Sequence, residues 1–356
     1  MNLPLWPGHS PSPLPGEPTR VVAAARPADP ARPAKARPKG RGKAKGRGKA
    51  RRPAVAPLKA LTPLGGLPQV LAGRYRLERL LGAGGMGVVY RARDLLHEQF
   101  GEPEPYVALK LVSEAFAESP DASALLYSEF ALARRLRHPN IVRLHSFEVD
   151  TGHGCAFITM ELLRGMTLDQ LLCQWPLGLP WDESREQVLA LLEALAHCHG
   201  RGVLHGDIKP SNLMLGDEGL RLFDFGLSRA AQGLLPGLPR LNRQRFNAWT
   251  PGYAAPELLD GEPLSAAADL FAVACVIHEL AGGKHPYRRL PSTEARDQQL
   301  HRQLQRPRHL PGHCWPALRA ALALDARERA ISVEELYRAV ATEGGWLRGW
   351  LSGRPR

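Results

Sequence analysis

The stretch that decides the fold reads HGDIKPSN at residues 205–212, and twelve residues after its asparagine comes a DFG triplet that begins at Asp224. Within this stretch, Asp207 is suited to accept or orient a hydroxyl group, and Lys209 can neutralise a phosphate that is being moved. Asn212 and Asp224 offer the oxygen ligands that Mg²⁺ prefers. Phosphoryl transfer needs positioning and charge neutralisation more than covalent chemistry from the protein, so these residue types in this order predict a phosphotransferase.

A glycine-rich stretch, GAGGMGVV at residues 82–89, lies upstream between two segments that alternate apolar and polar residues. Glycines let the backbone approach phosphates without a β-carbon in the way. The flanks read strand–turn–strand, which favours a hairpin that covers a nucleotide over a dinucleotide-binding turn; spacing alone leaves an ordinary glycine turn open. The predicted nucleotide contacts of this hairpin are Leu81, Gly82, Ala83, Gly84, Gly85, Met86, Gly87 and Val89.

A single lysine stands on the next predicted strand, in the sequence VALK at residues 107–110. Lys110 can hold the α- and β-phosphates of a nucleotide, and Ala108 is a further predicted nucleotide contact. From residue 60 onward the chain has three lysines against thirty arginines, and two of the three are Lys110 and Lys209. A compact ammonium differs from a planar guanidinium, so this usage argues against Lys110 being an ordinary surface lysine.

Glu129 lies in a segment with helical spacing, residues 122–137, and is the candidate ion-pair partner of Lys110. The alternative is a solvated helix glutamate. Further helical spacing is predicted over residues 181–199, 266–280 and 315–324.

Two later clusters add to the pattern. The segment TPGYAAPE at residues 250–257 has the character of a substrate-docking turn, and Asp269 and Arg329 are candidates for buried charges that need partners. We predict an ion pair between Glu257 and Arg329; two separate surface charges are the alternative.

The net charge of +12 comes from the N-terminal fifth of the chain. Residues 1–73 hold fourteen Lys or Arg against two acidic residues, which leaves 33 of each sign in the rest. Residues 1–70 are rich in Pro, Ala and Gly and predict a disordered tail, because they cannot bury enough apolar surface to offset chain entropy. The densest part, residues 32–52, is either a solubilising segment or a contact for nucleic acid, an acidic protein or an anionic surface. It has no interleaved aromatic residues, which disfavours sequence-specific DNA recognition.

Cysteine usage and hydropathy narrow the class of protein. Five cysteines are scattered without metal-ligand spacing, which predicts reduced thiols and neither a disulfide framework nor a zinc site. No apolar run approaches the length needed to span a bilayer, and the first residues lack the pattern of a signal peptide. These features predict a cytoplasmic protein.

Together, the motifs resemble the protein-kinase family, and in particular its bacterial Hanks-type (eukaryotic-like) serine/threonine branch, over residues 74–340. The order of strands first and helices later already indicates an α+β chain. The resemblance implies an N-lobe with an antiparallel sheet and one helix at residues 74–163 and a mainly helical C-lobe at residues 164–340. Residues 341–356 would be a short C-terminal extension.

The resemblance also implies the activity of a non-specific serine/threonine protein kinase, which uses ATP with Mg²⁺ (or Mn²⁺) and acts on Ser/Thr acceptors of proteins, itself included. A cognate phosphatase is an expected partner. By position, Met160 resembles the gatekeeper, and Glu161 and Leu163 resemble the hinge that holds adenine.

One departure from the family pattern is informative. The family usually has His-Arg-Asp where this chain has His205-Gly206-Asp207, and the missing arginine normally pairs with a phosphorylated activation loop. That loop has no Ser, Thr or Tyr between Ser228 and Thr250. We therefore expect a kinase that is not switched on by phosphorylation within residues 229–249.

Two alternatives stay open on the sequence alone. The His-Gly-Asp triplet also occurs in small-molecule phosphotransferases of the aminoglycoside type, although these typically lack the Ala255-Pro256-Glu257 cluster and Arg329. The other alternative is a pseudokinase scaffold that recruits partners through its basic tail.

Overall fold

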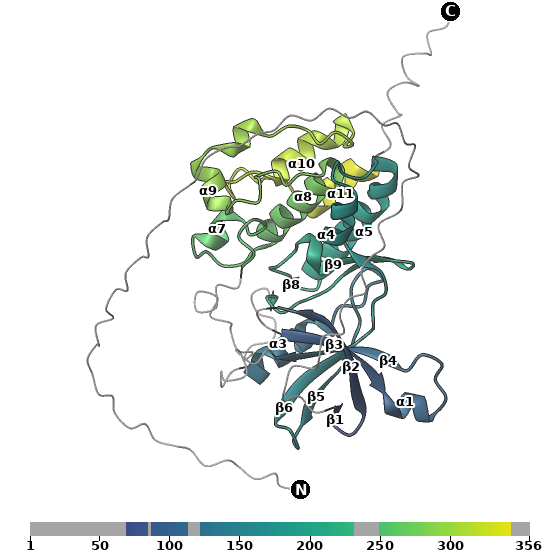
Figure 1. The fold of residues 1–356 in the computed structure, drawn as a ribbon. Coiled ribbons are helices and arrows are strands. Elements are labelled where there is room, and N and C mark those ends of the chain that lie inside the picture. Colours follow the sequence, from purple (N-terminus) through teal and green to yellow (C-terminus); the bar gives the residue numbers. More distant parts are fainter. Residues whose placement is uncertain (1–68, 85–86, 113–121, 231–248, 343–356) are drawn as a thin grey trace, which may run out of the picture. The chain divides into compact units, whose positions relative to one another are not determined.

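The computed structural model describes residues 69–84, 87–112, 122–230 and 249–342. Within these ranges the N-terminal part is an antiparallel sheet with one long helix, and the C-terminal part is mainly helical (Figure 1). This confirms the predicted α+β, two-lobed fold class. Residues 1–68 of the predicted disordered tail and most of the C-terminal extension lie outside the described residues, but Val70, at the predicted end of the tail, already belongs to a β-strand.

The N-lobe sheet has six antiparallel strands in the order β1-β2-β3-β4-β6-β5. Its apolar side chains alternate along the strands and form a small core, where the rings of Tyr75 and Phe157 meet edge to face at 5.6 Å. The strands are β1 (Val70–Leu71), β2 (Tyr75–Ala83), β3 (Gly87–Asp94), β4 (Tyr106–Val112), β5 (Leu144–Asp150) and β6 (Cys155–Met160).

The predicted glycine hairpin joins β2 to β3. Gly82 pairs with Val89, and the N–H of Gly84 donates to the carbonyl oxygen of Gly87 at 2.9 Å. A β-carbon on Gly87 would lie 2.8 Å from the carbonyl oxygen of Leu111, so only glycine fits there. The tip residues Gly85 and Met86, both predicted contacts, lie outside the described residues.

Two helices belong to this lobe. Helix α3 (Ala122–Ala133) packs on the sheet through Leu126 and Phe130, which contact Ile158, and this places Glu129 on the buried side. The short α1 (Leu95–Gln99) is an element that the sequence analysis did not predict. It begins at Asp94, whose carboxylate accepts from two N–H groups of the first turn and pairs with Arg74 at 2.6 Å.

The C-lobe is built around α8, a helix that is buried along almost its whole length. It begins at the capping hydroxyl of Ser265 and ends at Gly283, where φ is +72°. Helix α5 presents apolar residues at helical spacing to the same core, and predicted helices 181–199, 266–280 and 315–324 all correspond to observed ones. The helices are α4 (Leu168–Gln174), α5 (Trp181–Gly200), α7 (Pro256–Leu259), α8 (Ala266–Gly282), α9 (Ser292–Asp297), α10 (Trp315–Ala321) and α11 (Val333–Ala341).

Short strands and 3-10 turns connect these helices. The strands form a three-stranded sheet, β10-β9-β7, and a pair, β11-β8. Their bounds are β7 (Met166–Thr167), β8 (Val203–Leu204), β9 (Leu213–Gly216), β10 (Gly219–Leu222) and β11 (Arg229–Ala230); the 3-10 turns are η1 (Pro210–Asn212), η2 (Leu300–Gln303) and η3 (Gly312–Cys314).

The predicted ion pair between Glu257 and Arg329 is present. The guanidinium of Arg329 is fully buried and lies 2.6 Å from the Glu257 carboxylate. It also donates to the carbonyl oxygens of Ala267 and Ala323, so every part of the buried charge has a partner. The pair ties the turn after the docking segment to the core of the lobe. No helix in the described part of the chain is long and apolar enough to cross a membrane.

Candidate active site

A cleft of about 650 Å³ opens between the glycine hairpin and the segment that contains residues 207–227. Every predicted site residue that the structure describes lines it. The lining comes from the hairpin (Leu81, Gly82, Ala83, Gly84, Gly87, Val89), from β4 and α3 (Ala108, Lys110, Glu129), from the end of β6 and the segment after it (Met160, Glu161, Leu163) and from the C-lobe (Asp207, Lys209, Asn212, Asp224). Residues far apart in sequence are therefore brought to one site.

Lys110 is held between two carboxylates. Its Nζ lies 2.7 and 2.8 Å from the two oxygens of Glu129 and 2.8 Å from Oδ1 of Asp224. Burial lowers the pKa of Lys110, but attraction to Asp224 and Glu129 outweighs it, and the net direction is upward. The ammonium is therefore charged, and the predicted pairing with Glu129 is present.

Asp224 responds to the same neighbour. Burial opposes its ionisation, yet the ammonium of Lys110 outweighs this and lowers the pKa of Asp224 to about 2. Its backbone φ of +64° is a conformation that few residues other than glycine adopt, and this turn directs the carboxylate toward β4. An ionised carboxylate with a side chain that is 42% exposed remains available to a cation.

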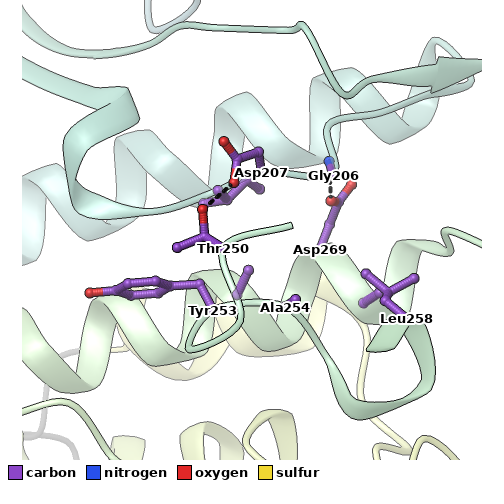
Figure 2. Close-up of a pocket in the computed structure, with 10 residues that line it drawn as sticks. Gly206, Asp207, Thr250, Tyr253, Ala254, Leu258 and Asp269 are labelled. Atoms are coloured by element: carbon purple, nitrogen blue, oxygen red, sulfur yellow. Dashed lines mark hydrogen bonds between the residues drawn. The ribbon is translucent and has the colours of Figure 1, made fainter. Parts of the chain in front are cut away.

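Asp207 is fixed on both of its oxygens, and Figure 2 shows its bond to Thr250. Oδ2 lies 2.7 Å from Nζ of Lys209 and accepts from the amide of Asn212 at 3.0 Å. Oδ1 accepts from the hydroxyl of Thr250 at 2.9 Å, and that hydroxyl accepts from Lys209 at 2.9 Å. A carboxylate, an ammonium and a hydroxyl thus form a closed set that holds the carboxylate in one orientation.

The loop that carries Asp207 is anchored from below by Asp269, which is 1% exposed. Its two oxygens accept from the backbone N–H groups of His205 and Gly206, each at 2.8 Å, and the second of these bonds is drawn in Figure 2. Gly206 has φ of +82°, a conformation that favours glycine. As expected, Asp269 is a buried charge with partners.

His205 is a packed residue and does not face the cleft. Its Nδ1 accepts from the N–H of Asp207, its Nε2 lies 3.2 Å from the carbonyl oxygen of Phe223, and its ring centroid is 4.7 Å from that of Phe225. Burial lowers its pKa. This arrangement is that of a neutral, structural histidine.

The segment after β6 offers backbone groups to a base. The N–H of Glu161 already donates to the carbonyl oxygen of Arg143 at 3.0 Å, so only its carbonyl oxygen remains for a ligand. The N–H of Leu163 has no hydrogen-bond partner among the described residues. One acceptor and one donor two residues apart can pair with the edge of a purine.

The sequence analysis missed part of the site. Thr250 was assigned to a docking turn, and its bond to Asp207 was not foreseen. The apolar wall was missed as well: Val142, Leu144, Met214 and Phe223 line the cleft. Strand alternation around Met214, two residues after Asn212, was the one available signal for these apolar contacts.

Comparison with known families agrees with this geometry. The family model described as "Protein kinase domain" matches residues 75–338, which is most of the chain. The chain therefore belongs to the protein kinase family, whose members in general use ATP and a divalent metal ion.

Similar proteins point to one branch of that family. Serine/threonine-protein kinase PkaA of Streptomyces coelicolor is 32% identical over 284 residues, which cover 76% of this chain and 50% of that protein. PknD of Mycobacterium tuberculosis is 33% identical over 284 residues (76% and 40%), and pkn3 of Myxococcus xanthus is 34% identical over 227 residues (62% and 39%). The chain thus spans half or less of the length of these curated relatives.

Among solved structures, the kinase domain of PknI from Mycobacterium tuberculosis superposes with a TM-score of 0.55 at 27% identity. The match covers 79% of this chain and 98% of that domain. It confirms the two-lobed kinase fold.

Proposed function

We propose that this chain is a serine/threonine protein kinase that transfers the γ-phosphate of ATP to hydroxyl groups of protein substrates. The observation that carries the proposal is the complete set of charged groups in one cleft: Lys110 with Glu129 and Asp224, and Asp207 with Lys209 and Asn212. The names of the most similar proteins support the same specificity.

Each group has a proposed role. Asp207 accepts or orients the proton of the acceptor hydroxyl, and Lys209 neutralises charge on the phosphate in transfer. Lys110 holds the phosphates that stay behind, and Glu129 fixes the lysine in place. Val89, Ala108, Met160 and the backbone of Glu161 and Leu163 surround the base, while the glycine hairpin, Gly85 and Met86 included, covers the phosphates.

The oxygen donors fit a hard divalent cation. Asn212 uses its amide nitrogen on Asp207, which leaves its carbonyl oxygen for a metal, and Asp224 is ionised. These two residues would hold Mg²⁺, with Mn²⁺ as an alternative. When bound, the metal supplies neutralisation of phosphate charge.

The structure bears on activation as well. The hydroxyl of Thr250 bonds to both Asp207 and Lys209 and so orients the two side chains. A phosphate on Thr250 would place about two negative charges against the carboxylate of Asp207, which is repulsive. We therefore propose that the kinase needs no activation-loop phosphorylation and that phosphorylation of Thr250 lowers activity.

The other expectations remain proposals: a cytoplasmic location, a cognate phosphatase, and a contact of residues 32–52 with nucleic acid, an acidic protein or an anionic surface. We also propose the domain boundaries: a tail at residues 1–70, an N-lobe at 74–163, a C-lobe at 164–340 and an extension at 341–356.

The test is transfer of labelled γ-phosphate from ATP with Mg²⁺ by the intact chain. Acceptors are the chain itself, myelin basic protein and kanamycin, and the matched variants are Lys110→Met and Asp224→Ala. We expect label on Ser or Thr of protein that both substitutions abolish. Label on kanamycin alone would indicate a small-molecule phosphotransferase, and ATP binding without transfer to any acceptor would indicate a pseudokinase scaffold.

A further inference from the structure

The C-lobe has a second concentration of positive charge, distinct from the N-terminal tail. Residues 284–308 hold seven Lys or Arg and two acidic residues, although residues 74–356 are neutral as a whole. Five of the seven side chains are exposed and have no ion pair among the described residues. We name these five the basic surface: Lys284, Arg288, Arg302, Arg306 and Arg308.

The two acidic residues of the segment do not neutralise the basic surface. Glu294 accepts from Gln298, and the nearest cation to Asp297 is Arg296, at 3.9 Å. Arg296 itself pairs with Asp260 at 2.5 Å. Exposed like charges that are held together without counter-charges repel one another, so a partner of opposite sign lowers the electrostatic energy of this surface.

The fold brings two stretches of chain together to make the basic surface. The ring of His278 lies between the carbonyl oxygens of Lys284 (2.9 Å) and Gln305 (3.3 Å). Arg288 donates to the side chain of Gln303 at 3.0 Å, and the N–H of His309 donates to Ala281 at 3.2 Å. The stretches 281–289 and 302–309 are therefore neighbours, beside α9 in the C-lobe (Figure 1).

This surface is continuous with the turn at the active site. The N–H of Ser292 donates to the carbonyl oxygen of Pro251, and a β-carbon on Gly252 would lie 3.3 Å from the carbonyl oxygen of Arg289. One residue before Pro251, the hydroxyl of Thr250 bonds to Asp207 (Figure 2). An extended polypeptide advances about 3.3 Å per residue, so residues several positions from an acceptor at Asp207 can reach this region.

We propose that the basic surface binds an acidic segment of the protein substrate, a run of Asp and Glu outside the acceptor position. The proposal rests on the proposed protein-kinase function and adds a substrate class to it. A polypeptide fits better than single-stranded nucleic acid, because residues 284–308 contain one Phe, Trp or Tyr, namely Tyr287, and it is fully buried. Residues 284–308 thus offer bases no exposed Phe, Trp or Tyr on which to stack.

The experiment compares two fluorescent peptides with the same acceptor threonine, one flanked by six glutamates and the other by six glutamines. Binding to the full chain is measured by anisotropy at low salt, and phosphate transfer to both peptides is measured in parallel. The variant is Arg302→Glu/Arg306→Glu/Arg308→Glu. The control is Arg76→Glu/Arg79→Glu/Arg137→Glu, which changes net charge equally at exposed N-lobe residues that do not line the cleft.

We expect wild type and control to bind the acidic peptide about tenfold more tightly than the neutral one, and to show a similar ratio of KM values with equal kcat. The triple C-lobe variant should show a clearly smaller preference than the control, because only the contribution of the N-terminal tail remains, and it should keep its kcat on the neutral peptide. Both proteins retain residues 1–68, so the tail contributes equally to each.

Equal binding of the two peptides by wild type, or a preference in the C-lobe variant as large as that of the control, overturns the proposal. So does an oligothymidylate that binds more tightly than the acidic peptide through the same three arginines, which would assign the surface to nucleic acid. Failure to label any acceptor would count against the kinase function instead, and anisotropy would still decide whether the surface binds an acidic chain.

Discussion

At the scale of single residues, the site depends on side chains that each make several short contacts. Thr250 is the least expected of them, since it reaches Asp207 across 43 positions of sequence. Its hydroxyl is both donor to the carboxylate and acceptor from Lys209, so it orients the two groups to which we assign the transfer step.

We predict that Thr250→Val lowers kcat about 10²-fold with little change in the KM for ATP, because misplacement of a catalytic group by about 1 Å has an effect of this size. Thr250→Ser keeps the hydroxyl and should restore most of the rate. Steady-state kinetics at saturating ATP is the measurement. A Val variant with wild-type kcat would show that Asp207 needs no such support.

The second prediction concerns His285, which is 6% exposed. Its Nδ1 accepts from the N–H groups of Tyr287 and Arg289, each at 3.1 Å. Burial first, and then repulsion from Arg289 and His278, lowers the pKa of His285 to about 3. In the unfolded chain the pKa is about 6.5, so the unfolded state takes up the proton first as pH falls.

Stability contributed by the neutral ring is therefore complete above about pH 6.5 and is lost as pH falls toward 3. Between pH 7.5 and 5.0 this residue should lower the free energy of unfolding by about 2 kcal/mol, at 1.36 kcal/mol per pH unit below 6.5. Urea unfolding at both values is the measurement, and His285→Gln should show a pH dependence weaker by that amount. An identical pH dependence in the variant would contradict the assignment.

The residues that carry chemistry were the most predictable part of the site. Few residue types can neutralise a phosphate or ligate magnesium, so the identity and spacing of such residues together indicate a site. This made five of them predictable: Lys110, Asp207, Lys209, Asn212 and Asp224. The apolar side chains that line the cleft were not predictable. An apolar residue such as Val142 or Met214 could equally well lie in a hydrophobic core, and only the folded chain shows which of them face the cleft.

At the scale of elements, long periodic helices and the glycine hairpin were predicted, whereas α1 was not. Five residues carry too little periodicity to be recognised, and α1 depends on Asp94, whose partner Arg74 is twenty positions away. Contacts between elements are equally invisible in sequence, and the turn between α4 and α5 is an example.

That turn depends on Gly178, whose φ is +82° and where a β-carbon would lie 2.7 Å from the backbone nitrogens of Gly282 and Gly283. We predict that Gly178→Ala destabilises the fold by at least about 2 kcal/mol, through left-handed strain and collision with the end of α8. Gly200 ends α5 with open space around it, so Gly200→Ala should change stability by no more than about 1 kcal/mol, in the stabilising direction. The measurement is the free energy of unfolding of both variants by chemical denaturation. Equal destabilisation by the two substitutions would refute the packing argument.

At the scale of the whole molecule, charge is divided between regions. Residues 32–52 hold eleven Lys or Arg, whereas residues 74–356 are neutral overall yet contain the basic surface. The two regions differ in kind, since the first is a run in sequence and the second is assembled by folding. The charge excess of residues 284–308 can be counted in the sequence, but only the fold shows which of its basic side chains are exposed and without an ion pair among the described residues.

For residues 32–52 we predict salt-sensitive binding to polyanions. Replacing Lys39, Arg41, Lys43, Lys45 and Arg47 by Gln should reduce the slope of log K against log salt for a single-stranded oligonucleotide by about 0.7 for each phosphate that is no longer neutralised. Phosphate transfer to a neutral peptide should be unchanged. Anisotropy titrations over a range of salt concentrations test this, and an unaltered slope would rule out the tail as the binding segment.

The pairing of Lys110 with two acids has a consequence for selectivity between forms of the nucleotide. Two basic residues line the cleft, Lys110 and Lys209, against four acidic ones, Glu129, Glu161, Asp207 and Asp224. The net charge of these side chains is negative, so the cleft repels a triphosphate that carries no metal ion. A triphosphate that carries a divalent ion has less negative charge and is repelled less. We therefore expect the cleft, as the proposed nucleotide site, to favour the complexed nucleotide at the stage of entry, so that chelation of divalent ions weakens nucleotide binding itself as well as stopping turnover.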